Sequence, residues 1–81
     1  MKPLDDIRKQ IDLLDDQLIE VLIKRYDLVQ QVKTYKQTHN LPVLDSSREQ
    51  HILKKLSNKP YHEQLEQIYH LILSLSKDLQ H

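Results

Sequence analysis

Two basic residues occupy positions in a long amphipathic stretch where their charge needs an explanation. Arg25 interrupts an otherwise apolar helical repeat, and Lys36 follows eleven residues later, close to three full turns, so both share one face. No acidic residue lies between positions 28 and 44. An unpaired buried charge is very costly, so a pocket for an anionic ligand would explain both residues. Periodicity alone favours the alternative, in which Arg25 pairs with a carboxylate such as Asp27 and Lys36 extends into solvent.

Arg8 could join such a pocket from another chain. It lies about a quarter-turn off the face that carries Arg25 and Lys36, so it cannot easily serve the same pocket within one chain. A second subunit could deliver it, whereas a surface ion pair with Asp12, four residues on, is the simpler explanation of Arg8 by itself.

Polar residues later in the chain also allow two interpretations. Arg48 and Glu49 stand at an expected helix start, where free backbone N–H groups attract anions. A pair between Asp45 and Arg48 and a capping contact from Glu49 would explain them without a ligand. Ser76 and Gln80 are four residues apart and share a helix face, either in a pocket or in solvent.

The composition removes several classes of site. The 81 residues include no cysteine, which excludes disulfides and thiolate metal sites, and no glycine, which excludes glycine-rich phosphate loops. The five histidines form no set at metal-ligand spacing, and no serine has the surroundings of a catalytic nucleophile. We therefore expect no metal site and no nucleotide bound by a glycine-rich loop.

Charge and hydropathy limit the kinds of binding partner that we expect. Twelve basic residues balance twelve acidic ones, whereas proteins that bind nucleic acid through its phosphates are normally basic. No apolar run is long enough to span a bilayer, and no secretory leader is recognisable. The expectation is a cytoplasmic protein without nucleic-acid or membrane partners.

Prolines divide the chain into three expected helices, with no strand pattern. Between Pro3 and Pro42, apolar residues recur at steps of three and four from residue 4 to residue 35, which indicates one long helix capped near Asn40. The run Ser46–Glu49 reads as a capping box that starts a second helix, whose apolar face continues to residue 56. A third helix is expected from about residue 62 to the C-terminus. The predicted fold class is all-α, one long and two shorter helices, with residues 1–81 as one domain.

The length of the first helix predicts a second copy of the chain. About 35 residues at 1.5 Å each extend roughly 50 Å, whereas a compact domain of this size spans only roughly 30 Å. The two shorter helices cannot cover such an apolar seam alone. An intertwined homodimer about a two-fold axis would cover it.

Taken in order, these residues resemble the all-α chorismate mutases, the AroQ class. The similarity extends over nearly the whole chain. Each short sequence fragment is weak evidence by itself, whereas the full series in this order and spacing is specific to the family. They are Ile7-Arg8-Lys9-Gln10-Ile11, Asp15, Lys24-Arg25, Lys36, Pro42-Val43-Leu44-Asp45-Ser46-Ser47-Arg48-Glu49, Ser76 and Gln80.

The resemblance implies a cofactor-free rearrangement of chorismate to prephenate, for phenylalanine and tyrosine biosynthesis, in an intertwined dimer with two shared pockets. Arg25 would bind one substrate carboxylate, and Arg8 would reach the other from the second subunit. Arg48 and Ser76 would complete the wall around the carboxylates.

The resemblance also implies how the breaking bond and the ring are held. Lys36 and Gln80 would hydrogen-bond the ether oxygen. Glu49, together with the backbone near Asp45, would hold the ring hydroxyl. These contacts favour the transition state because negative charge develops on the ether oxygen as the carbon–oxygen bond breaks.

Two other functions fit parts of the pattern. Isochorismate–pyruvate lyases share this fold and much of the pocket, and retention of Asp45, Arg48 and Glu49 together favours the mutase. A non-catalytic helical dimerisation module would explain the apolar seam, but not Arg25 on that seam or the unneutralised Lys36.

Overall fold

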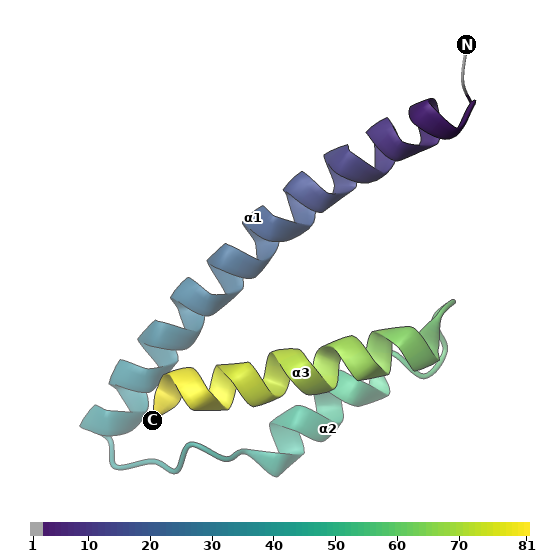
Figure 1. Cartoon of the computed structure of the whole chain (residues 1–81). Helices are drawn as coiled ribbons and strands as arrows, with labels where there is room; N and C mark the ends of the chain where they lie inside the picture. The colour runs from purple at the N-terminus through teal and green to yellow at the C-terminus, as the bar shows by residue number, and fades with distance from the viewer. Residues whose placement is uncertain (1–2) are drawn as a thin grey trace.

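The computed structural model describes residues 3–81, and they form three α-helices (Figure 1). Helix α1 spans Pro3–Thr38, α2 spans Ser46–Lys54 and α3 spans His62–Gln80. Helices α2 and α3 lie side by side, and the second half of α1 packs near the C-terminal end of α3, so the molecule has the shape of an open V (Figure 1). The predicted all-α class, with one long and two shorter helices, is confirmed.

The first helix begins and ends where the sequence predicts. Asp5 and Asp6 lie in its first turn, near the positive end of the helix dipole. After the helix, Asn40 adopts the left-handed conformation with φ of 55°, and the Leu41 N–H donates to the Lys36 carbonyl at 2.9 Å. This is a Schellman ending, and asparagine tolerates its left-handed position better than most residues do.

The predicted capping box of the second helix is wrong. The residue that caps α2 is Asp45, whose Oδ1 accepts from the Arg48 backbone N–H at 3.1 Å, and Glu49 pairs elsewhere. A charged carboxylate is a stronger acceptor at a helix N-terminus than a serine hydroxyl. The helix also ends at Lys54, and bonds of the tighter i→i+3 type then turn the chain so that Leu56 remains buried.

The core of the single chain is small. Its buried apolar side chains are Val29, Ile52, Leu56 and Leu73, which come from the second half of α1, from α2, from the turn after α2, and from α3. Ser76 is buried among them and is 6% exposed. The core therefore lies where the three helices meet, beside the site described below.

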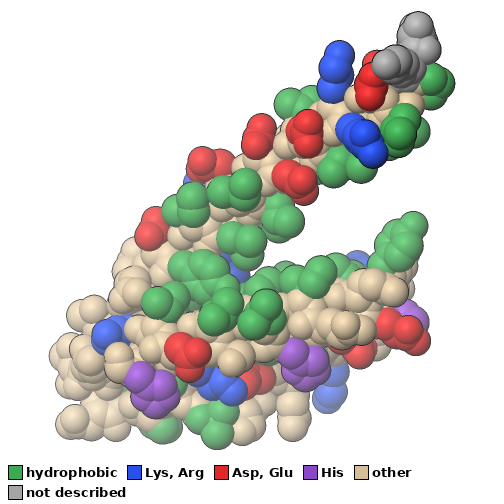
Figure 2. Space-filling model, in the orientation of Figure 1, with side chains coloured by type: hydrophobic (Ala, Val, Ile, Leu, Met, Phe, Trp, Pro, Cys, Tyr) green, Lys and Arg blue, Asp and Glu red, His purple; other side chains and the backbone are tan. Residues whose placement is uncertain are grey.

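The first half of α1 extends beyond this core (Figure 1). Its apolar seam remains between 48% and 62% exposed at Leu4, Ile7, Ile11, Leu14, Leu18 and Val21. The chain measures 59 × 25 × 15 Å and has a radius of gyration of 16.3 Å, against about 12 Å for a compact domain of this length. Figure 2 shows apolar side chains on both sides of the gap between α1 and α3. No helix within residues 3–81 has the length and apolar character needed to cross a membrane.

Candidate active site

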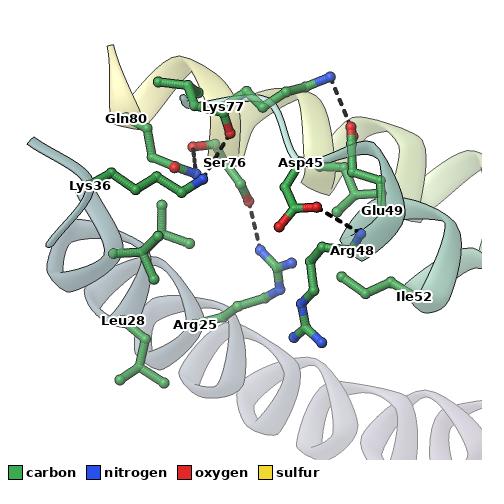
Figure 3. A pocket seen from close by; sticks show the side chains of 14 residues that line it. Arg25, Leu28, Lys36, Asp45, Arg48, Glu49, Ile52, Ser76, Lys77 and Gln80 are labelled. Carbon is green, nitrogen blue, oxygen red and sulfur yellow. Dashed lines mark hydrogen bonds and ion pairs between the residues drawn. The ribbon is translucent and has the colours of Figure 1, made fainter. Parts of the chain in front are cut away.

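A cavity of about 430 Å³ lies where the three helices converge (Figure 3). Its size falls within the range of roughly 300–1,000 Å³ that is usual for small-molecule sites. The side chains around it are apolar on one side and charged or polar on the other. They are Arg25, Leu28, Val29, Val32, Lys36, Val43, Asp45, Arg48, Glu49, Ile52, Leu73, Ser76, Lys77 and Gln80.

Arg25 is held in the cavity by a neutral partner. Its Nη1 donates to the Ser76 Oγ at 2.6 Å, and that hydroxyl donates its own proton to the Ile72 carbonyl at 2.6 Å. No carboxylate of residues 3–81 lies within 4 Å of the guanidinium, so the pairing with Asp27 considered above is not formed. The positive charge of Arg25 is thus fixed in place but not neutralised.

Lys36 points into the same cavity and is half-buried, so it does not extend into solvent. Its Nζ donates to the Val43 carbonyl at 2.8 Å, which ties the end of α1 to the segment that leads to α2. An ammonium group has three N–H donors, so two remain for a ligand.

Gln80 lies one helical turn beyond Ser76 and lines the same end of the cavity as Lys36 (Figure 3). Its Nε2 donates to the Ser76 carbonyl at 3.1 Å, while its Oε1 is buried without a partner among residues 3–81. A buried acceptor without a partner costs about 1–3 kcal/mol. A ligand donor would satisfy this oxygen. A half-turn of the amide would present its NH₂ group to a ligand acceptor instead, and would break the hydrogen bond to the Ser76 carbonyl.

The start of α2 supplies an anionic cap and a cation. The pKa of the Asp45 carboxyl is lowered, first by the hydrogen bond from the Arg48 backbone N–H and then by that from the Ser47 hydroxyl. Asp45 lines the cavity, but its Oδ1 is occupied by these two donors. The Arg48 guanidinium lies on the same side of the cavity as that of Arg25 (Figure 3).

Glu49 has a partner that the sequence did not indicate. The Lys77 Nζ, on α3, lies 3.1 Å from Glu49 Oε1. Lys77 is separated from Glu49 by 28 positions, so no local pattern predicts the pair. One feature of the sequence could have indicated Lys77 as a site residue. It lies three residues before Gln80, so the two share one helix face.

The charges around the cavity favour a dianionic ligand. Arg25, Lys36, Arg48 and Lys77 face two carboxylates, so the lining has a formal excess of two positive charges. Both carboxylates already have partners: Asp45 accepts from a backbone N–H of α2, and Glu49 pairs with Lys77 of α3. Within residues 3–81, no three histidine, aspartate or glutamate side chains are placed to share a metal ion.

Arg8 is the predicted site residue that the fold does not bring to the cavity. It is exposed on α1, seventeen residues before Arg25, which corresponds to about 25 Å along the helix. No ion pair with Asp12 forms within the described part of the chain. The other seven predicted residues line the cavity: Arg25, Lys36, Asp45, Arg48, Glu49, Ser76 and Gln80.

Three comparisons with known proteins found similarity to this chain. A conserved hypothetical protein from Pyrococcus furiosus has the same fold, with a TM-score of 0.87 and 33% identity over 100% of this chain and 99% of that one. The T-protein of Haemophilus influenzae is 45% identical over 49 residues, which are 60% of this chain and 13% of that protein. Residues 7–81 match the sequence family described as chorismate mutase type II. The chain therefore belongs to the type II chorismate mutase family.

Proposed function

We propose that the chain catalyses the rearrangement of chorismate to prephenate, a step of aromatic amino acid biosynthesis. The observation that carries this proposal is the cavity, in which two unneutralised arginines, an ammonium and an amide converge in a member of this family. Chorismate has two carboxylates, which the positive excess of the lining would attract.

The first task of such a site is to hold the substrate in its compact, reactive conformer. Arg25 would bind one carboxylate in the two-pronged geometry that suits guanidinium, with Ser76 fixing its position through the 2.6 Å bond. Arg48 would complete this wall. The apolar side of the cavity, which includes Val32 and Leu73, would exclude water from the ring. Orientation of this kind lowers the barrier of a reaction within a single molecule.

The second task is to stabilise the charge that develops during the reaction. As the carbon–oxygen bond breaks, negative charge accumulates on the ether oxygen, and Lys36 and Gln80 lie at the same end of the cavity to receive it. Lys36 has two unused N–H donors, and the Gln80 amide would turn to donate. Glu49 and the backbone near Asp45 would hold the ring hydroxyl.

The proposal includes a homodimer that completes the site. Arg8 would bind the second carboxylate from the partner chain, since about 25 Å separates it from Arg25 of its own chain. Six apolar residues of the α1 seam are about half exposed, and a second copy packed along that seam would bury them. The same packing would bring the N-terminal half of the partner's α1 toward the gap between α1 and α3 (Figure 1).

A continuous assay of chorismate absorbance with the purified chain tests the activity. Saturable loss of chorismate, with prephenate identified as the product, is the expected result. If a folded dimer leaves chorismate unchanged, the proposal is wrong, and turnover of isochorismate would then assign the related lyase reaction.

Mixing two inactive variants tests the shared site. Chains with Arg8→Ala and chains with Arg25→Ala should each lose activity, and their heterodimers should regain it in one of the two pockets, which would have both arginines. Homodimers of each variant are the matched controls. Confirmed heterodimers without activity would contradict a site built from two chains.

A further inference from the structure

The Glu49–Lys77 pair borders two neighbouring cavities. The larger, of about 430 Å³, is the candidate active site, and a smaller one of about 240 Å³ lies in the groove between α2 and α3. Glu49, Leu73 and Lys77 line both. Lys77 reaches from α3 to the Glu49 carboxylate on α2 at 3.1 Å (Figure 3), so the ion pair borders both cavities.

We propose that Lys77 is a positioning residue that orients Glu49 for the substrate's ring hydroxyl; this rests on the proposed function. Glu49 shares its cavity with the guanidinium groups of Arg25 and Arg48. A glutamate drawn to either arginine would neutralise a charge that the substrate carboxylates need. The nearby ammonium offers the carboxylate another cation and keeps it on the α2–α3 wall.

The geometry of the pair leaves Glu49 able to accept a further hydrogen bond. Lys77 contacts Oε1, and no partner of the second oxygen is present among residues 3–81. A carboxylate accepts through both oxygens, so Oε2 remains available for a hydroxyl proton. The Glu49 side chain is 21% exposed and that of Lys77 38%, so solvent partly screens the attraction between them.

Steady-state kinetics of the full chain with chorismate test the role of Lys77. Lys77→Met keeps the apolar stem and removes the charge, and should lower kcat/KM about threefold to fivefold, the size expected of a half-exposed ion pair. The loss should appear in KM, because the ring hydroxyl is bound alike in the ground state and the transition state. Lys77→Arg, which retains a cation of similar reach, should restore most of the loss.

Two further variants separate positioning from a merely structural effect. In a Glu49→Gln background, Lys77→Met should cause no additional loss, because its effect passes through Glu49. Lys54→Met removes a cation from the exposed side of α2 that lines neither cavity, and should leave the kinetics unchanged.

Three results would overturn the inference. These are unchanged kinetics in Lys77→Met, a loss of the same size in the Glu49→Gln background, and a loss confined to kcat. Each leaves the mutase assignment intact as long as the wild-type chain converts chorismate. A folded wild-type chain that converts none would overturn both the assignment and the role of Lys77.

Discussion

Replacing Lys36 with methionine removes one charge from the candidate site and leaves most of its shape. Methionine retains an unbranched apolar stem, so the cavity wall stays filled. The structure attributes one fixed contact to the ammonium, the 2.8 Å hydrogen bond to the Val43 carbonyl. Losing that bond should lower the free energy of unfolding by about 0.5–1.5 kcal/mol.

The effect on catalysis should be much larger than the effect on stability. In the proposed mechanism, Lys36 donates to an oxygen that becomes negative in the transition state. Removing a donor of this kind costs other enzymes about 10²- to 10³-fold in kcat, or about 2.7–4 kcal/mol. We expect a fall of at least this size in Lys36→Met, because this donor is also charged. The KM should change little, since the ether oxygen is uncharged in the bound substrate.

The assay is loss of chorismate absorbance under saturating substrate, with helicity and dimerisation measured on the same preparations. Lys33→Met is the matched control, since Lys33 lies on the same helix, is half-buried and does not line the cavity. The control should retain kcat. A Lys36→Met protein that folds normally and keeps kcat within about tenfold of wild type would refute the assignment of Lys36 to the developing charge.

Three further outcomes are expected. Ser76→Ala removes the 2.6 Å partner of Arg25, so KM should rise and the free energy of unfolding in urea should fall by about 1–2 kcal/mol. The lowered pKa of Asp45 means that its capping stabilises the fold above the ordinary value of 3.8, and that this contribution is lost as pH falls through the lower folded pKa. Urea midpoints across the acid range should therefore depend less on pH in Asp45→Asn, which keeps a capping side chain. Leu18→Asp places a charge on a seam residue that is 55% exposed in the single chain, so sedimentation should find monomers without turnover, and an active dimer would contradict the proposed interface.

The helices were predictable because their signals are local. The spacing of apolar residues and the prolines delimit α1, and Asn40 occupies the left-handed position where no glycine is available. The start of α2 near Ser46 was predicted correctly, but its cap was not, because three adjacent residues could each supply it: Asp45, Ser46 and Ser47. The charged side chain caps the helix, a choice that depends on the field of the helix rather than on the pattern.

The sequence predicted the charged residues of the site, but not the hydrogen bonds and the ion pair that hold them. A shared helix face placed Arg25 and Lys36 together from sequence alone. The hydrogen bond from Arg25 to Ser76 joins residues 51 positions apart, so no local sequence pattern predicts it. The hydrogen bond from Lys36 ends on the backbone carbonyl of Val43, which every residue type has, so the sequence does not predict it either. The role of Lys77 was missed for a similar reason. Its partner Glu49 is on another helix, and the two residues meet only because α2 and α3 pack side by side. That Arg8 of one chain enters the active site of its partner remains a prediction.

The exposed first half of α1 has a consequence for amide hydrogen exchange. Its backbone bonds lie within one helix, and most of the stability of helices in proteins comes from tertiary packing of an apolar face, which here is about half exposed. In an isolated chain these amides should exchange quickly, through local fraying, while amides near Val29 and Leu73 are protected by the core. Diluting a dimer should therefore accelerate exchange in residues 4–21 first, so this segment would serve as an internal probe of subunit dissociation, distinct from unfolding of the remaining chain.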